Sequence, residues 1–394
     1  MRIAIYSEFP FPIGSSGTNR LISYSRGLVE LGNSLHVFIG KPTENLNQTF
    51  NNQNKGNFKG IKYTYPTKKI IKSKHKIIRV LEIFIGLIFT IKNICNEHKA
   101  NAFDALLISN DYPGKVFCIS LLAKLLKITK CILIVDEFPI PIRYGKNDIP
   151  KFSFLLYKNS FRRINALFSM THALNEYYTN NFNVKKSLIV PMTVENDRFE
   201  NIIIDNKHNY LAYIGNLEIV KDGVDILIEA FSIILKDFPD IKLKLYGGGS
   251  QKETLILKEM SEKLNIANNV VFEGRIDRDK VPSVLCNARA LLLPRPSSKR
   301  ADGGFPTKLG EYLASGVPAV VTSVGEISLY LDDGVNVYIV EPDSAELFAK
   351  KVLFVLKNPE HAKKVGLKGK ELALEKFNYF NQARDMANFI SHLK

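Results

Sequence analysis

Short apolar segments that alternate with helical patterns run through the whole sequence and restrict the folds open to it. In the first half the predicted strands are 2–6, 35–39, 105–108, 131–135, 166–169 and 187–190. In the second half they are 210–214, 241–246, 269–273, 290–293, 319–322 and 337–340. Strands this short and this apolar, separated by helices, are typical of a parallel sheet covered on both faces. The sequence therefore predicts an α/β protein made of two consecutive Rossmann-like halves.

Helical patterns fill the gaps between these strands. The first is expected at 17–31, where Gly32 follows in the usual position of a helix C-cap. The others are expected at 222–236, 250–264, 279–287, 306–315 and 344–356, with 359–394 mostly helical. The polar, Asn-rich stretch from Lys41 to Gly60 lacks periodicity and is expected to be a long loop.

A polar segment near 191–209 separates the two strand–helix series. We therefore predict an N-terminal domain at 1–200, a C-terminal domain at 201–375, and a tail helix at 376–394 that returns toward the N-terminal domain. A length of 394 residues suits two domains. In such folds ligands bind beyond the carboxyl ends of the strands, at the point where the strand order reverses.

The net charge of +15 is carried almost entirely by the first half. Residues 1–200 hold 28 Lys and Arg against 14 Asp and Glu, whereas the remaining residues hold 26 against 25. A basic domain favours nucleic acid, an anionic membrane surface or an acidic substrate as its partner. The four cysteines form no C-x-x-C pair, which indicates reduced thiols rather than a zinc site or a disulfide framework.

The N-terminus lacks the pattern of a signal peptide and runs directly into a strand. The longest apolar stretch, 77–91, is interrupted by Arg79 and Glu82 and is too short to span a bilayer. A run of cations precedes it, comprising Lys68, Lys69, Lys72, Lys74, Lys76 and Arg79. Two readings stay open at this point: a helix on an anionic membrane surface, or a solvated loop before a helix buried in the domain core.

Three glycine-rich loops follow predicted strands. Gly14 to Gly17 precedes the first helix, where free N–H groups favour an anion, although a plain strand–helix loop would look the same. Gly215 is followed by Lys221 six residues later, an arrangement that suits a diphosphate unless Lys221 is only a surface residue beside a capping Asp222. The run Gly247 to Gly249 lacks the third glycine of a dinucleotide fingerprint, so a nicotinamide cofactor is not expected.

The segment 294–318 (PRPSSKRADGGFPTKLGEYLASGVP) is the richest in chemistry. Lys308 and Glu311 are three residues apart, so they share one helix face near its N-terminus. A carboxylate there can accept the two hydroxyls of a ribose, although an ion pair between the two residues would explain the spacing equally well. Such a pair would not explain the Gly-Gly loop or the basic residues Arg295, Lys299 and Arg300 beside it.

The string GGFPTKLGEYLASGVPAVVTSVGEI resembles the nucleotide-sugar-binding motif of the GT-B glycosyltransferases, and more narrowly of the retaining glycosyltransferase family 4. Further strings that fit the family occur in the expected order over nearly the whole chain: VPMTVENDRF, YIGNLEIVKDG, LYGGGS, VVFEGRI and FNYFNQARDMANF. The resemblance implies a GT-B fold, with two Rossmann-like domains whose parallel sheets face each other across a cleft. It also implies transfer of a sugar from a UDP or GDP sugar, with no bound metal and no cofactor.

The resemblance also implies roles for individual residues. Lys221 would contact the diphosphate and act in catalysis, Glu311 would hold the ribose, and the backbone of residues 305–307 would meet the transferred sugar. The donor-binding set is Gly14, Gly17, Gly215, Asn216, Lys221, Gly247, Arg275, Arg295, Gly304, Phe305, Pro306, Thr307, Lys308 and Glu311.

Two positions depart from the family pattern. Asn216 stands where the family usually has Arg, so one cation is missing that Arg295, Lys299 or Arg300 would have to replace. Gly303 stands where the family has the first of two glutamates spaced eight apart, with Asp302 beside it. These departures leave the identity of the donor sugar open.

The leaving phosphate is the base that the family implies, and Glu137, at the end of an apolar strand, is the side-chain candidate; His172 is a weaker one. The basic first domain suits a glycan or lipid-linked acceptor at the inner face of the cell membrane, in polysaccharide biosynthesis. We therefore expect a cytoplasmic, peripheral membrane enzyme that binds no nucleic acid. A GT-B sugar-nucleotide epimerase and a non-catalytic two-lobed nucleotide-sugar binder are the alternatives.

Overall fold

The computed structural model describes residues 1–47, 49–205 and 209–393, and the chain divides into two compact units. Unit 1 comprises Met1–Thr193 and Tyr379–Lys394, and unit 2 comprises Val194–Asn378. The sequence placed these boundaries at 200/201 and 375/376. Residues 206–208 of the expected linker lie outside the described residues.

Unit 1 is built on an eight-stranded sheet with the order β3-β4-β2-β1-β5-β6-β7-β8. Its strands are β1 (Arg2–Ser7), β2 (Ser34–Ile39), β3 (Lys55–Phe58), β4 (Ile61–Thr64), β5 (Ala105–Ser109), β6 (Lys130–Val135), β7 (Ala166–Ser169) and β8 (Ser187–Ile189). All neighbours pair in parallel except β3 and β4. The strand order reverses between β1 and β5, so the loops after these strands lie at the switch point.

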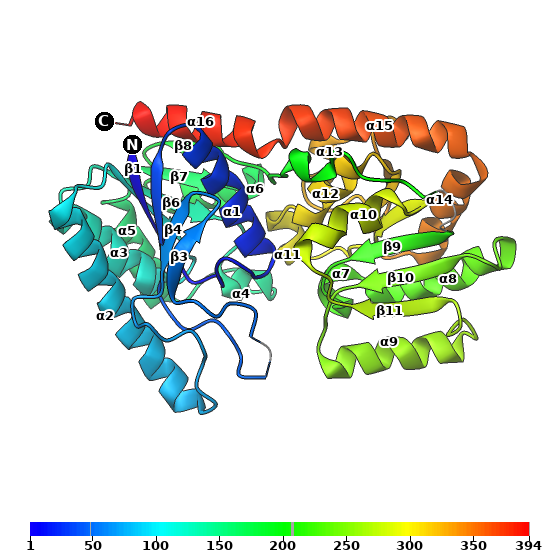
Figure 1. The fold of residues 1–394 in the computed structure, drawn as a ribbon, viewed down its shortest axis with the longest axis horizontal. Coiled ribbons are helices and arrows are strands. Elements are labelled where there is room, and N and C mark those ends of the chain that lie inside the picture. Colours follow the sequence, from blue (N-terminus) through cyan, green and yellow to red (C-terminus); the bar gives the residue numbers. More distant parts are fainter. Residues whose placement is uncertain (48, 206–208, 394) are drawn as a thin grey trace. The chain divides into compact units, whose positions relative to one another are not determined.

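The helices of unit 1 are α1 (Ser16–Glu30), α2 (Lys76–Ala100), α3 (Pro113–Leu125), α4 (Ile140–Arg143), α5 (Lys151–Phe161), α6 (His172–Asn181) and α16 (Tyr379–Ser391). The last of these, α16, lies along α1, as Figure 1 shows. A Cβ on Gly27 would lie 2.5 Å from the Cβ of Ala383, and the Tyr379 hydroxyl donates to Glu30 at 2.8 Å. The small residues at 27 and 383 therefore let the two helices approach closely.

The expectation of a continuous loop from Lys41 to Gly60 is wrong in its last third, because β3 begins at Lys55. Lys59 and Gly60 have φ values of 51° and 80°, and they form the tight turn between β3 and β4. In β4, Ile61 and Tyr63 are buried, whereas β3 has a single large apolar side chain, Phe58, which is half-buried and packs against the core. The pattern of β3 is therefore set by its pairing with β4 and not by its own hydrophobicity.

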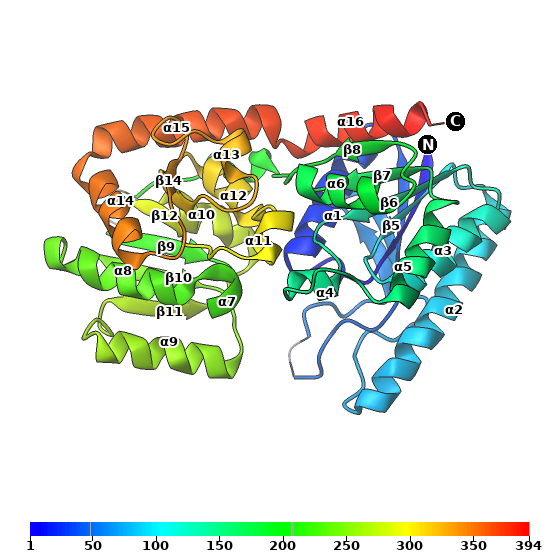
Figure 2. The same cartoon turned by 180° about the vertical axis from the view of Figure 1, so that it is seen from behind.

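The apolar segment that the sequence placed at 77–91 forms the first part of the longer helix α2. The reading in which this helix is buried in the core is wrong, because only Gly86, Thr90 and Ile94 of α2 are buried. Figures 1 and 2 show α2 on the outside of unit 1. Among the residues that the structure describes, no helix is both long enough and apolar enough to cross a membrane.

Unit 2 is built on a six-stranded, wholly parallel sheet with the order β11-β10-β9-β12-β13-β14. Its strands are β9 (Tyr210–Ile214), β10 (Lys242–Tyr246), β11 (Val270–Gly274), β12 (Ala290–Leu293), β13 (Ala319–Thr322) and β14 (Tyr338–Val340). The order reverses between β9 and β12, which are almost entirely buried. The loops after these two strands therefore form the switch point of unit 2.

Helices flank the sheet of unit 2 (Figure 2). They are α7 (Ile219–Asp222), α8 (Val224–Asp237), α9 (Gln251–Lys263), α10 (Val281–Cys286), α11 (Lys299–Gly303), α12 (Thr307–Ser315), α13 (Ile327–Tyr330), α14 (Ala345–Lys357) and α15 (Pro359–Lys376). Two 3₁₀ turns, η1 (Asn196–Phe199) and η2 (Arg278–Lys280), complete it. The predicted helices of the second half all occur, with α7 and α11 added as short turns beside the switch point.

Candidate nucleotide-sugar site

The loops after β9 and β10 stack on each other beside the switch point of unit 2. The backbone N–H of Gly215 donates to Tyr246 at 2.9 Å, and that of Leu217 donates to Gly248 at 3.0 Å. A Cβ on Gly247, whose φ is +139°, would lie 1.7 Å from the Gly215 carbonyl oxygen. The loops after β9 and β10 can therefore stack this closely only because position 247 is a glycine.

The side chain of Lys308, from the first turn of α12, lies under the loop after β9. Its Nζ donates to Asp222 Oδ1 at 2.9 Å and to the Tyr213 hydroxyl at 2.8 Å. A Cβ on Gly215 would lie 2.2 Å from this Nζ, so the ammonium group is directly beside the glycine. The ion pair between Lys308 and Glu311 that the spacing allowed is not what forms, since Lys308 pairs with Asp222.

Three cations gather around this loop. Burial lowers the pKa of Lys308, and Asp222 opposes that effect, whereas Arg295 and Lys221 lower the pKa further. Lys221 is the third residue of the one-turn helix α7 and is half-buried, while Arg295 follows β12 and is 5% exposed. The structure thus brings together Lys221, Arg295 and Lys308, which the sequence proposed from two separate segments.

Glu311, the residue expected to hold a ribose, is held by an arginine that sequence reasoning did not single out. Arg198 Nη1 lies 2.5 Å from Glu311 Oε1, and its Nη2 donates to the carbonyl of Arg278. Arg278 in turn pairs with the fully buried Glu195 at 2.9 Å. The string VENDRF, which contains Glu195 and Arg198, was the only signal in the sequence.

The loop between α11 and α12 presents backbone to the same region. The Ser298 hydroxyl caps α11 by accepting from the N–H of Ala301 at 3.1 Å. The Phe305 ring packs against Tyr330 and Phe377, with centroids 5.5 and 5.9 Å away. Helix α12 begins at Thr307, one residue later than expected, and Pro306 is its N-cap. An α-helix leaves its first N–H groups without intrahelical partners, and these suit a phosphate or sugar oxygen.

A Cβ on Gly304 would lie 3.8 Å from Arg295 Nη2, so the Arg295 guanidinium lies against this loop. Of the three cations named as replacements at position 216, the other two lie near acidic side chains. Lys299 lies 3.8 Å from Asp302, and Arg300 Nη1 lies 3.9 Å from Glu218. Lys299 and Arg300 therefore line the rim, whereas Arg295 lies within the cation cluster.

Two further predicted donor residues are exposed at the edge of these loops. Asn216 donates from its side chain to Glu218 at 2.9 Å, and its carbonyl accepts from the Tyr213 hydroxyl at 2.6 Å. The side chain of Arg275 passes about 3.5 Å from where a Cβ on Gly248 would lie.

In unit 1, Gly14 and Gly17 are required by packing. A Cβ on Gly14 would lie 2.1 Å from Thr18 Oγ1, and one on Gly17 would lie 2.5 Å from the Phe9 ring. The nearby Glu8 is a buried residue that the sequence analysis missed: it pairs with Lys115, and with Lys41 at 2.9 Å.

Burial raises the pKa of the Glu8 carboxyl, but Lys41 and Lys115 outweigh this effect and hold it below the usual value. Glu8 is therefore an ionised carboxylate at the switch point of unit 1.

The base candidate Glu137 follows β6 and is paired. Its Oε2 lies 2.5 Å from Arg143 Nη1, and Arg143 also binds Asp111. His172 is the first residue of α6, directly after the N-cap Thr171.

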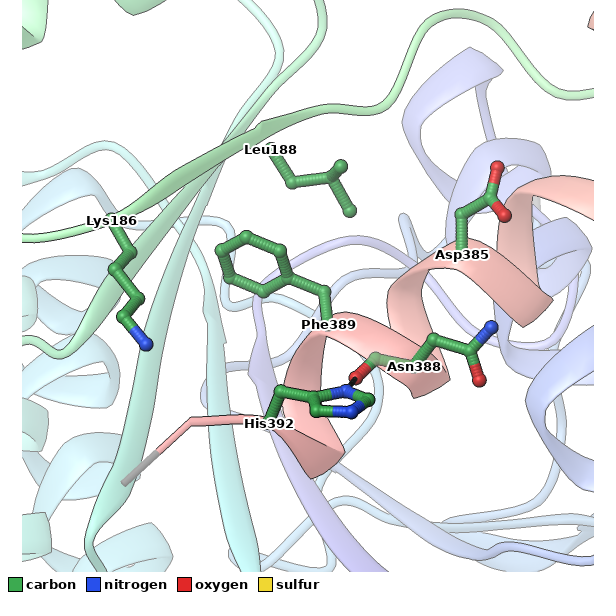
Figure 3. A pocket seen from close by; sticks show the side chains of 6 residues that line it. All are labelled: Lys186, Leu188, Asp385, Asn388, Phe389 and His392. Carbon is green, nitrogen blue, oxygen red and sulfur yellow. Dashed lines mark hydrogen bonds between the residues drawn. The ribbon is translucent and has the colours of Figure 1, made fainter.

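Figure 3 shows a separate hollow in unit 1, between β8 and α16. Its floor is Leu188 and Phe389, and its rim is polar. It contains none of the predicted site residues. Within 1–47, 49–205 and 209–393, no group of three or more His, Cys, Asp or Glu side chains is arranged to hold a metal ion.

Comparison with known proteins identifies the second half of the chain. The profile of the family described as Glycosyl transferases group 1 matches residues 194–372, which is nearly all of unit 2. Unit 2 belongs to this family. The cation cluster, Glu311 and the α11–α12 loop therefore all lie in a glycosyl transferases group 1 domain.

One relative is the GDP-mannose-dependent alpha-(1-6)-phosphatidylinositol monomannoside mannosyltransferase of Mycolicibacterium smegmatis. It is 28% identical over 175 residues, which are 43% of this chain and 45% of that protein. The match thus spans less than half the length of this curated relative.

Two solved structures resemble the whole chain. Sucrose-phosphate synthase from Thermosynechococcus elongatus superposes with a TM-score of 0.77 at 14% identity, covering 100% of this chain and 98% of that one. Anabaena HepE in complex with UDP gives 0.75 at 13% identity, covering 100% of both chains. The predicted fold class is confirmed: the chain has the GT-B fold, with two parallel-sheet α/β domains.

Proposed function

We propose that this protein is a retaining glycosyltransferase. It moves a sugar from a UDP or GDP sugar to a hydroxyl of a lipid-linked or cell-surface glycan. The observation that carries the proposal is the cluster of Lys221, Arg295 and Lys308 around Gly215, at the switch point of a glycosyl transferases group 1 domain. Together with the Asp222 carboxylate, these cations leave a net charge of two positive charges, which suits a diphosphate.

The remaining contacts of the donor would come from the same loops. Glu311 would accept the ribose hydroxyls, and Arg198 would keep its carboxylate in place. The backbone at Phe305 to Thr307, at the start of α12, would bind the sugar and a phosphate oxygen. Gly247 would allow the nucleotide to approach the loop after β9.

The chemistry follows from where charge develops. The leaving nucleoside diphosphate becomes more negative as the bond to the sugar breaks, so fixed cations beside it stabilise the transition state more than the ground state. Lys221 is the catalytic cation in this proposal. The leaving phosphate takes the proton of the acceptor hydroxyl, which attacks from the face that the diphosphate leaves. Glu137, which forms an ion pair with Arg143, is the second candidate for this role.

The proposal includes both UDP and GDP sugars as donors. The relative from M. smegmatis is named as GDP-mannose-dependent, and the HepE structure contains UDP. The acceptor side rests on unit 1, where the excess of basic residues suits a phosphate-bearing, lipid-linked glycan at the cytoplasmic face of a membrane. No step assigned to the residues of this chain uses a resident metal.

The test is a donor panel on the full chain. Thermal shift with UDP, GDP, ADP, CMP and dTDP, each with and without EDTA, should show a selective and EDTA-insensitive stabilisation by UDP or GDP. Ligand at about 100 times its dissociation constant stabilises by roughly 2.7 kcal/mol. Lys221→Ala and Glu311→Ala should abolish the shift, whereas Lys252→Ala and Glu259→Ala, exposed on α9, should retain it.

Turnover of the matching nucleotide sugars separates the enzyme classes. A transferase releases the nucleoside diphosphate, an epimerase yields a new nucleotide sugar, and a binder yields neither. Absence of any nucleotide shift would refute the donor site itself. A shift that EDTA removes would refute the metal-free mechanism.

A further inference from the structure

Helix α2 has large apolar side chains on the face that points away from its own domain. Ile77, Leu81, Phe84 and Ile88 recur at a spacing of four, three and four residues, which places them on one stripe of the helix. Ile77 is 78% exposed, and Phe84 and Ile88 are each 63% exposed. The flanking exposed apolar residues are Ile78, Val80, Ile85 and Phe89.

The opposite face, which packs on the domain, carries the buried residues Gly86, Thr90 and Ile94. A Cβ on Gly86 would lie 2.1 Å from the carbonyl oxygen of Gly40, so the helix is pressed against the loop after β2. The Thr90 hydroxyl donates to the Gly86 carbonyl at 2.7 Å, within the helix. The outward face of α2 is thus apolar, whereas the outward face of a normal surface helix is polar. The outward stripe is available to a partner.

Cations lie at both ends of this stripe. Exposed Lys68, Lys69 and Lys74 lie in the segment before α2, and exposed Lys76 and Arg79 lie in its first turn. Beyond the apolar turns, Lys92 and Lys99 are exposed in the later turns. The acidic residue among the apolar turns, Glu82, is already paired with Lys69 and accepts from the N–H of Ser73 at 3.2 Å.

We propose that α2 is an interfacial anchor, whose outward stripe inserts among the acyl chains of an anionic lipid bilayer while the flanking cations bind lipid phosphates. An amphipathic helix of this kind lies in the plane of the membrane, with the apolar face buried near the headgroup boundary. Each basic residue near the surface strengthens the attraction to anionic lipids. Gly86, Thr90 and Ile94 keep the other face on the domain, so α2 can enter only by its outward half.

Charge favours a bilayer over a second copy of the chain. Parallel pairing of two α2 stripes would bring the two N-terminal cation clusters together. Antiparallel pairing would bring each cluster against Lys92 and Lys99 of the other copy. An anionic surface neutralises all of these cations, so the stripe and the charges have the same partner.

The inference deepens the proposed function by naming the surface where a lipid-linked acceptor would be met, but its evidence is independent of the donor site. The experiment is co-sedimentation of the full chain with phosphatidylcholine vesicles, with and without phosphatidylglycerol. We expect binding to the anionic vesicles that weakens as salt is raised.

The anchor variant is Leu81→Gln, Phe84→Gln and Ile88→Gln combined. Because these side chains are exposed and Gln is a good helix former, the fold should be retained. Binding should fall roughly tenfold or more. The matched control is Leu255→Gln, Leu347→Gln and Leu374→Gln, three exposed leucines of unit 2, which should bind as the unmodified chain does. Lys74→Glu with Lys76→Glu should weaken binding to the anionic vesicles, and Lys252→Glu with Lys363→Glu should not.

Equal binding by the anchor variant and its control would overturn the proposal. So would a chain that ignores vesicles but changes from dimer to monomer in sedimentation when α2 is altered, which would make a second copy the partner. The nucleotide thermal shift of the anchor variant should be unchanged. Loss of vesicle binding with an intact shift, or the reverse, therefore tells which of the two proposals has failed.

Discussion

Replacing Lys308 by methionine tests whether the cation cluster is held in place by a buried ion pair. Methionine keeps the length and most of the volume of the side chain but removes the ammonium group. Asp222, whose side chain is 5% exposed, would then lose the charge that lies 2.9 Å from its Oδ1. An uncompensated carboxylate would remain in the interior, next to the backbone that carries Lys221.

The size of the effect follows from burial and distance. At an effective dielectric constant of about 20, two unit charges 2.9 Å apart attract by about 6 kcal/mol before desolvation is subtracted. Removing one partner of a buried pair costs about 3–5 kcal/mol. Repulsion from Arg295 and Lys221 in the native protein favours the lower end, so we expect about 3 kcal/mol. For a unit of this size the melting temperature should fall by on the order of 10 °C.

The assay is thermal and urea unfolding followed by circular dichroism, because the chain has no tryptophan. Lys357→Met is the matched control: its partner Asp237 lies 2.5 Å away, but both side chains are about half exposed. An exposed pair of this kind is worth less than about 1 kcal/mol. The combined change Lys308→Met with Asp222→Leu should recover most of the lost stability. A Lys308→Met shift no larger than that of the control would refute the argument.

The remaining predictions concern other parts of the molecule. Arg198→Ala should raise the KM for the donor roughly tenfold in a turnover assay, because one charged hydrogen bond that orients Glu311 is lost. An unchanged KM would show that Arg198 does not position Glu311 for donor binding. Burial lowers the pKa of His36 from its usual 6.5 to about 4. Between these two pH values the imidazole is protonated in the unfolded chain but neutral in the folded one. The free energy of unfolding should therefore fall by about 3 kcal/mol as the pH drops from about 6.5 to 4. In urea unfolding, His36→Gln should show a weaker dependence of this free energy on pH than the unmodified chain. Equal pH dependence in the two proteins would contradict the prediction. Gly247→Ala should weaken the nucleotide thermal shift and destabilise by a few kcal/mol, whereas Gly274→Ala, whose φ is +73° but whose Cβ meets nothing, should cost only about 1–3 kcal/mol of backbone strain and keep the shift.

The strand–helix alternation could be predicted because buried parallel strands carry their signal locally. The segments 166–169, 210–214, 290–293 and 319–322 are strands with the predicted bounds. The segment Lys55–Phe58 was not predicted as a strand because Phe58 is its one large apolar residue and it pairs only with the neighbouring strand β4. The exposure of α2 could not be predicted from the sequence for a different reason. A run of large apolar residues in a helix predicts burial, and nothing in the run itself says which surface covers it.

The site residues could likewise be predicted only where the signal is local. Lys221, Glu311 and the Gly-rich loops lie in recognisable strings, whereas their partners are distant in the sequence. Asp222 and Lys308 are 86 residues apart, and Arg198 and Glu311 are 113 apart. The local spacing of Lys308 and Glu311 favoured a pair between them, but the packing of α12 against β9 turns one toward Asp222 and the other toward Arg198. Local periodicity fixes which residues share a helix face, and tertiary packing decides which partner each one meets.

The contacts of Lys308 bear on the departure from the family pattern at Asn216. The resemblance implies an arginine at this position, and its loss alone would remove one cation from the diphosphate region. The ammonium of Lys308 lies beside Gly215, the residue before Asn216, and Arg295 lies within range of it. In the proposed donor site the charge would therefore come from beneath the loop, from the Lys308 side chain that Asp222 and Tyr213 hold in one orientation. A fixed cation of this kind needs no reordering when a phosphate arrives, so it stabilises developing negative charge at little entropic cost.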